Sequence, residues 1–375
     1  MESNLRSYQH KTGRGERTYS EFERLATHLT LVHEDLFVPA LPDMTVSVIA
    51  GQRPEDEDKL LLARMQRWIN LITSHPVFKY SDLVKEFAES GQGFMPTVKP
   101  QSFHRHPSRF QLMKGGLGLS GGAPADVDNE YISLTNQIQA FSQGLQAVSK
   151  AVQANFKCRK ALSTSYLELG NKMGTFSEKE NNAIIQNSYR RMADALQECG
   201  ELQRPQAQAE NALLTDAVAY QTKNAQIAKD ALDARLAGIS QHHESTKTTE
   251  SKLKTMNKLK ASNSIKSARV NDAIEDMQEA KAQEQEVYRR CEKVNLNLKK
   301  ELSGRYKTQV TEDITKTLAD YVKAQIQYER QMLQKWEGLQ HSQGMSVNRT
   351  SRWREGSIEG RIDERKAAAL LGTAS

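Results

Sequence analysis

The chain has 375 residues and a net charge of +6, and 38% of its residues are hydrophobic. Its mean hydropathy of −0.68 is low for a compact enzyme and is typical of elongated helical bundles, which have much surface per residue. No stretch approaches the roughly 18 apolar residues of a membrane span, and no secretory signal begins the chain, so we expect an intracellular protein that is soluble or peripheral on a membrane.

The first region, residues 1–99, has a mixed pattern and holds five of the nine prolines. Apolar residues at helical spacing predict short helices over residues 19–31, 60–74 and 82–88. Between the first two, the prolines of Val38–Pro42 predict an extended turn, because each proline disfavours a helical conformation in the residue before it. We interpret this region as a small α+β unit.

Residues 100–125 are predicted to be a linker, since they contain five glycines within eight positions. A short basic and apolar segment, Arg109–Lys114, lies inside it. This segment is either a helix on a membrane surface or part of a flexible tether, and the tether is the favoured interpretation.

From residue 126 to about 340 a seven-residue apolar repeat dominates, and Pro205 is the single proline after Pro124. Such a repeat with almost no proline predicts long helices that pack against other helices. Gly170 and Gly174, with Ser177 before Glu180 as a new capped start, predict the first turn, and residues 261–264 predict the second. The result is three long helices, the second from about 180 to 260.

Three helices of this length form a narrow rod, because some 70 residues span roughly 105 Å. Its apolar surface would be hidden most easily by a second chain, so we expect a curved antiparallel dimer. The repeat fades at the end of the chain, and residues 341–375 are predicted to be a flexible tail.

Motifs of catalysis and metal binding are missing from the sequence. The doublet His242–His243 lies on a polar helical face and is interpreted as solvent-exposed. The acidic run Glu55–Asp58 is interpreted as the first turn of a helix, where negative charge is favourable. Three widely spaced cysteines fit reduced thiols in the cytosol. We therefore expect no enzyme, no metal and no cofactor.

A basic cluster surrounds the predicted second turn of the rod. It contains seven cationic residues and one carboxylate, Glu250, and its members are Lys247, Lys252, Lys254, Lys258, Lys260, Lys266 and Arg269. Near an anionic bilayer each basic residue contributes about 1 kcal/mol. We predict that this tip contacts membrane; a lysine-rich face exposed to water is the alternative. Nucleic acid is not expected as a partner, because few aromatic residues accompany the lysines.

Two groups of motifs carry a resemblance to a known family. The first resembles a phox-homology (PX) domain and consists of Arg17–Phe22, Val38–Pro42, Arg64–Trp68 and Ser74–Pro76. The second resembles a BAR domain and includes Tyr321–Gln325 and Gln334–Glu337. In this order they resemble a sorting nexin of the PX–BAR type, and the run from Thr18 to Pro42 is most similar to the fungal retromer-associated member that pairs with a second nexin.

The resemblance implies a mostly α protein: a PX domain in residues 1–99, whose first strands we expect to be partly missing, and a BAR domain in residues 126–340. It also implies a peripheral endosomal protein that senses curvature or forms membrane tubules. The implied partners are phosphatidylinositol 3-phosphate, a second PX–BAR nexin in a heterodimer, and the retromer subunits that recognise cargo. The implied process is transport from endosomes to the Golgi.

The phosphoinositide pocket departs from the family pattern. Thr18, Asp43 and Leu61 stand where the family places arginine, lysine and arginine, so the charge-assisted donors of a phosphate site are missing. The remaining candidates for a degenerate pocket are Arg17, Tyr19, Arg64 and Arg67. The family's membrane loop corresponds to Met44, Val46, Val48 and Ile49, which either enter lipid or fold back on Trp68.

Two alternatives stand beside this hypothesis. One is a cytosolic coiled-coil scaffold that uses its PX-like unit to bind protein. The other is a related PX–BAR nexin that acts in autophagy, which would differ in its partners and not in its physics.

Overall fold

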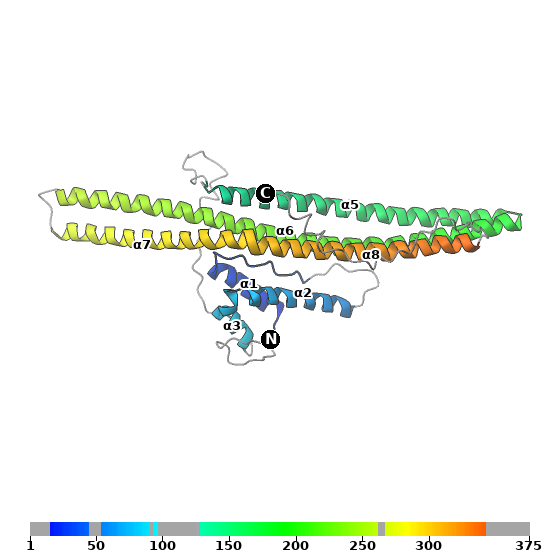
Figure 1. Ribbon diagram of the computed structural model, residues 1–375, viewed down its shortest axis with the longest axis horizontal. Helices are drawn as coiled ribbons and strands as arrows, with labels where there is room; N and C mark the ends of the chain where they lie inside the picture. Colours follow the sequence, from blue (N-terminus) through cyan, green and yellow to red (C-terminus); the bar gives the residue numbers. More distant parts are fainter. Residues whose placement is uncertain are drawn as a thin grey trace, which may run out of the picture.

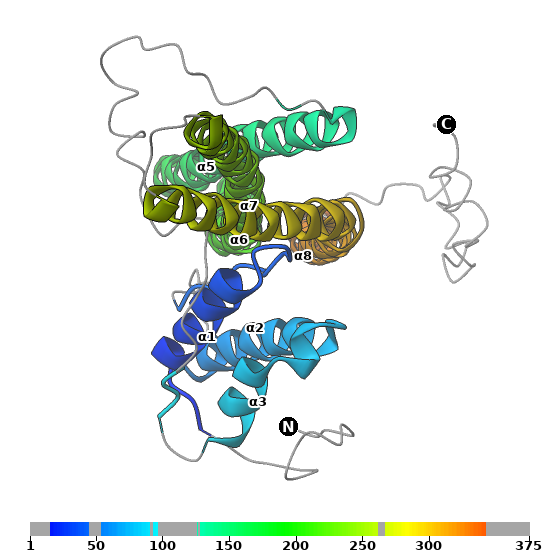
Figure 2. The same cartoon turned by 90° about the vertical axis from the view of Figure 1, so that its left-hand side faces the viewer.

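A computed structural model describes residues 16–44, 54–90, 93–96, 126, 128–261 and 267–342. Figure 1 shows a long helical rod with a small helical unit packed beside its middle. Figure 2 looks along the rod, where the small unit forms a separate layer beneath the bundle. Across the described ranges the secondary structure is helical and contains no strand.

The small unit consists of α1 (Tyr19–Val32), α2 (Pro54–Ser74), the 3₁₀ turn η1 (Phe78–Tyr80) and α3 (Asp82–Glu89). The three predicted helices are confirmed, and α2 begins earlier than expected, so the acidic run 55–58 lies in its first turn. The predicted α+β character is not seen in the described part of this unit. Its core gathers large apolar side chains around Trp68, including Leu25, Leu29, Ile72, Phe78, Leu83, Val84, Phe87 and Phe94.

A capping box begins α1. The Thr18 backbone N–H donates to Glu21 Oε2 at 2.7 Å, and the Phe94 N–H donates to Glu21 Oε1 at 2.7 Å. These backbone donors, those of Thr18 first, lower the pKa of the buried Glu21 carboxyl to about 2. One side chain therefore satisfies the helix start and holds the end of the unit against it.

The rod begins with α5 (Asn129–Lys179) and α6 (Ala183–Ala261), which pack along each other. At the start of α5, Asp128 caps the helix and the Tyr131 hydroxyl donates to the Asn295 carbonyl at 2.6 Å. The Arg235 guanidinium lies 3.5 Å from the centre of the Tyr131 ring. The 79 residues of α6 span about 119 Å at 1.5 Å per residue.

The first turn of the rod lies at residues 180–182, not at the predicted glycines. Gly170 and Gly174 are inside α5, so the predicted helix end was wrong, and Gly170 packs closely against α6 instead. A Cβ atom on Gly170 would lie 2.9 Å from Gln197 Cγ and 3.0 Å from the Ala193 carbonyl oxygen. Gly200 faces α5 just as closely, so small residues let α5 and α6 approach each other.

The third helical segment of the rod is continuous, but its helix type changes along its length. It consists of α7 (Ser267–Lys300), the π-helical turn η3 (Glu301–Tyr306) and α8 (Lys307–Ser342). The predicted second turn is confirmed, since α6 ends at Ala261 and α7 begins at Ser267. The predicted tail lies outside the described residues. A second core joins this third segment to the rest of the rod through Tyr131, Leu134, Ile138, Leu232, Val294, Leu298, Leu302 and Tyr306.

Candidate lipid-binding and partner-binding surfaces

The extended segment after α1 attaches the small unit to the rod. The Phe37 ring packs edge-on against Tyr306, with ring centres 4.9 Å apart. The Ala40 backbone N–H donates to Asn224 Oδ1 at 2.8 Å, and the Trp68 indole N–H donates to the Pro39 carbonyl at 2.9 Å. The predicted proline turn is therefore sandwiched between α2 and α6.

Charged side chains reinforce this attachment on both sides of the segment. Asp35 accepts hydrogen bonds from Lys293 at 3.2 Å and from Asn297 at 2.7 Å, both on α7. Glu34 pairs with Arg290. At the π-helical turn, His75 Nε2 lies 3.2 Å from Glu301 Oε2, and both residues are buried. A π-helical turn often marks a functional site, and here it receives the small unit.

The structure places the predicted phosphoinositide residues in contacts within the chain. Arg64 pairs with Asp216 of α6 at 2.7 Å, and Arg67 pairs with Asp313 of α8. Arg17 donates to the Phe87 carbonyl at 2.8 and 2.9 Å and to Ser90, so it caps the end of α3. A phosphate group at this site would have to compete with these acceptors.

Tyr19 and the segment before α2 contain the remaining predicted lipid-binding residues. The Tyr19 hydroxyl donates to the Pro42 carbonyl at 2.9 Å, and burial raises its pKa. Asp43 pairs with Lys223 of α6. Met44 is 59% exposed. The other predicted membrane-loop residues, Val46, Val48 and Ile49, lie outside the described residues.

The basic cluster lies at one end of the rod, where α6 ends and α7 begins (Figure 1). Its members Lys247, Lys254, Lys258, Lys260 and Arg269 are exposed, and Lys266 lies outside the described residues. Lys252 is half-buried and lies 3.6 Å from Asp276 of α7. Exposed carboxylates of α7 reduce the net positive charge at this end of the rod. They are Asp272, Glu275, Asp276 and Glu279. The basic residues around the turn alone did not indicate this reduction.

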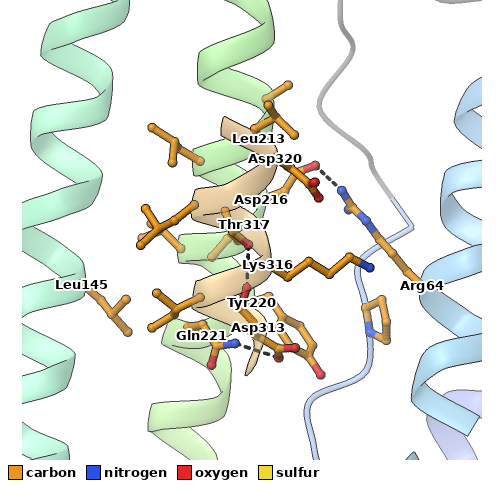
Figure 3. A pocket seen from close by; sticks show the side chains of 18 of the residues that line it. Arg64, Leu145, Leu213, Asp216, Tyr220, Gln221, Asp313, Lys316, Thr317 and Asp320 are labelled. Carbon is orange, nitrogen blue, oxygen red and sulfur yellow. Dashed lines mark hydrogen bonds and ion pairs between the residues drawn. The ribbon is translucent and has the colours of Figure 1, made fainter. Parts of the chain in front are cut away.

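A groove of about 670 Å³ lies where α5, α6 and α8 meet α2. In Figure 3, α8 runs in front of α6, with Leu145 of α5 on one side and Arg64 of α2 on the other. The side toward α5 is apolar and includes Phe141, Leu145, Val148, Leu213, Ile314 and Leu318. Val148 and Leu318 are about half exposed, at 47% and 52%. We call this side the apolar groove.

Further large apolar side chains are exposed toward the other end of the rod. Phe176 and Tyr189 stack edge-on with ring centres 4.7 Å apart, and Ile184 is 80% exposed. Together with Ile185 they form an end patch at the turn between α5 and α6. On α8 the exposed series Leu318, Val322, Ile326 and Leu333 leads away from the groove. Isolated apolar residues on a surface need no explanation, but a contiguous series indicates a binding surface.

Comparison with known families decides the identity of the rod. A family model described as Vps5 C terminal like matches residues 125–342. The chain belongs to this family. A second model, the PX domain, matches residues 5–90. The predicted order of a PX domain followed by a BAR-type helical region is thereby confirmed, and the chain is a PX–BAR sorting nexin.

Two yeast proteins are similar to the chain. The chain is 25% identical over 324 residues to vacuolar protein sorting-associated protein 17 of Schizosaccharomyces pombe, covering 86% of this chain and 57% of that protein. It is 22% identical to the protein of the same name from Saccharomyces cerevisiae, covering 84% of this chain and 55% of that one. The PX–BAR chain thus spans a little over half the length of these relatives.

A solved structure supports the fold. The chain in the cryo-EM structure of the SNX-BAR Mvp1 tetramer matches with a TM-score of 0.55 and 17% identity, covering 86% of this chain and 88% of that one. In the part of the PX–BAR chain that the structure describes, no helix has the length and hydrophobicity to cross a bilayer. The same part contains no cluster of histidine, cysteine and carboxylate residues suited to a metal ion.

Sequence reasoning predicted an exposed apolar surface on this PX–BAR rod but did not show which residues form it. The sequence pattern assigns the apolar stripe of α8 to one core. In the structure the stripe divides between partly buried residues, such as Ile314 and Tyr321, and exposed ones, such as Leu318. A signal was present, because Leu318, Val322 and Ile326 follow one another at four-residue spacing. Residues at four-residue spacing shift gradually around the helix surface, because a turn has 3.6 residues. One helix can therefore pack against its own bundle and against a neighbouring one.

Proposed function

We propose that this PX–BAR sorting nexin pairs with a second PX–BAR chain to form an arched, peripheral membrane protein on endosomes. It acts there with retromer in the transport of receptors from endosomes to the Golgi. The observation that carries the proposal is the combination of the apolar groove and the end patch on a narrow rod. Both need a second chain to cover them, and a chain of the same kind offers matching surfaces.

The membrane part of the proposal rests on geometry and charge. Pairing of two rods through their grooves leaves the basic clusters at the outer ends of the pair. Each exposed lysine near an anionic bilayer contributes about 1 kcal/mol, reduced by salt. A rigid arch brings both ends onto a curved surface at once, and simultaneous contact raises the apparent affinity without any new contact.

Lipid selectivity is assigned mainly to the partner. In this chain Arg17, Arg64 and Arg67 are held by carbonyl and carboxylate oxygens, as described above. A headgroup phosphate would leave Asp216 and Asp313 without their cations, and separating such pairs is costly where they are buried. We therefore propose that phosphatidylinositol 3-phosphate binds chiefly through the second nexin, while this chain contributes shape and charge.

Vesicle flotation tests the proposal. The full chain, alone and co-expressed with a second PX–BAR nexin, is mixed with vesicles that contain phosphatidylserine, with or without phosphatidylinositol 3-phosphate. We expect the pair to float with both vesicle types, more with the phosphoinositide and more with small vesicles than with large ones. Absence of flotation for the pair at moderate salt would favour the cytosolic scaffold instead.

The names of the relatives support retromer over autophagy. Both yeast proteins are named for vacuolar protein sorting, and we extend this role to the present chain. An autophagy nexin would bind membranes through the same physical interactions, so only the identity of the partners distinguishes the two functions. Affinity purification of the full chain should recover retromer subunits that recognise cargo; recovery of autophagy factors without retromer would overturn this part of the proposal.

A further inference from the structure

A layer of polar side chains interrupts the apolar surface of the rod between the apolar groove and the end patch. We call it the polar layer; its members are Asn155, Arg159, Gln203, Gln206, Glu210, Gln325 and Glu329. Glu210 and Gln206 are 2% and 1% exposed. Such a layer lowers stability relative to apolar packing, and in helical bundles polar layers can fix register and partner.

The members of the polar layer connect three helices. Arg159 Nε of α5 lies 2.9 Å from Glu210 Oε1 of α6, and Arg159 also donates to Gln325 of α8 at 3.3 Å. Asn155 donates to Glu210 Oε2 at 2.9 Å. The Gln206 amide donates to Gln325 Oε1 at 3.0 Å and to Glu329 Oε1 at 3.2 Å.

One charge in this layer has no cation opposite it among the residues that the structure describes. Arg159 and Glu210 neutralise each other, whereas Glu329 accepts from the uncharged amide of Gln206. Residues three and four positions away on α8 are apolar or neutral, so these neighbours on its own helix supply no compensating charge. Glu329 is exposed, and a second rod could reach it.

The polar layer lies midway between the two apolar surfaces. Along α5, Arg159 is about 21 Å from Leu145 of the groove and about 26 Å from Phe176 of the end patch, at 1.5 Å per residue. If each end patch of a symmetric pair enters the groove of the other chain, the two-fold axis passes near this midpoint. Two identical chains would then bring Glu329 close to its own copy.

We propose that the polar layer selects the partner, disfavouring two identical rods and favouring a second PX–BAR rod with a cationic side chain at the matching layer. This inference rests on the pairing proposed above. Like charges placed together at an interface oppose association, and opposite charges at the same place favour it. The layer therefore gives a physical reason for a heterodimer that the apolar surfaces alone do not give.

A charge exchange at one position tests the inference with this chain alone. Wild type, Glu329→Lys and an equal mixture of the two, one carrying a mass tag, are compared by native mass spectrometry and sedimentation velocity. We expect the mixed dimer to form at least tenfold more tightly than either self-pair. The matched control is Glu312→Lys, an equal change at an exposed site on α8 outside the groove, which should show no preference for mixing.

A mixed dimer no tighter than the stronger self-pair would overturn the inference, and so would a lack of association in every sample. Leu318→Asp in the wall of the apolar groove separates this failure from that of the proposed pairing. If Leu318→Asp abolishes self-association while mixing shows no preference, pairing through the groove stands and the role of the polar layer falls. If Leu318→Asp changes nothing, the proposed pairing falls as well.

Discussion

Single side chains hold the small unit together and fix it to the rod. Glu21 serves two backbone donors, Arg17 caps α3, and Asn224 satisfies the Ala40 N–H, which is buried between the unit and the rod. A buried donor that loses its acceptor costs about 1–3 kcal/mol, so each of these residues matters beyond its size. The arginines expected to hold a phosphate are thus part of the architecture.

The capping carboxyl of Glu21 gives a pH-dependent prediction. The pKa of this carboxyl is lowered to about 2 in the folded unit. Its contribution to the stability of the unit is therefore complete above the ordinary pKa near 4.5 and is lost as the pH falls toward 2. Glu21→Gln should lower the stability of the small unit by roughly 1 kcal/mol at pH 7. Thermal unfolding against pH should show the two proteins converging at low pH; a constant difference down to pH 2 would contradict the assignment.

At the scale of the helices, small residues set how closely the rod packs. Ser163 donates to the Gly200 carbonyl at 2.7 Å, and this contact lies between α5 and α6. The sequence contained these residues, but glycine in a helical pattern also predicts a helix end, and the local pattern cannot separate the two meanings. Whether a glycine ends a helix or packs against a neighbour depends on the residue opposite it on the other helix. That residue is visible only in the folded rod.

Alanine at Gly200 tests this packing. Its Cβ atom would lie 2.9 Å from Leu167 Cγ and 3.1 Å from the Ser163 carbonyl, so the helices must separate. We expect Gly200→Ala to destabilise the rod by about 1–3 kcal/mol in urea unfolding. Gly338→Ala on α8 is the matched control, because a Cβ atom there would meet nothing within 4 Å in the described part of the chain, and it should be neutral or slightly stabilising. Equal effects at both sites would refute the packing role.

Element type and order could be predicted from the sequence because they depend on local pattern. The heptad repeat with its single proline predicted the long helices, and residues 261–264 marked the second turn correctly. The attachment of the small unit could not be predicted, because it pairs residues such as Ala40 and Asn224 that are 184 positions apart. The predicted lipid-binding residues remain predictions, and the structure adds the contacts with which a lipid must compete.

For the whole molecule, we expect the position of charge along the rod to decide where membrane contact occurs. Replacing Lys252, Lys254, Lys258 and Lys260 by glutamate should weaken vesicle binding by tenfold or more, since four contacts of about 1 kcal/mol are reversed. Replacing Asp272, Glu275 and Glu279 by lysine should strengthen binding at the same end. Flotation over a salt series measures both sets, and unchanged binding in both would remove this end of the rod from the mechanism.

The pairing of two rods through the apolar groove is the claim on which the function depends. Small-angle X-ray scattering combined with sedimentation equilibrium, on the full chain with its partner nexin, measures it most directly. We expect a particle with the mass of two chains and a maximum dimension greater than the roughly 119 Å of α6 alone, and Leu318→Asp should return it to single chains. A compact particle with the mass of one chain at all concentrations would contradict the account.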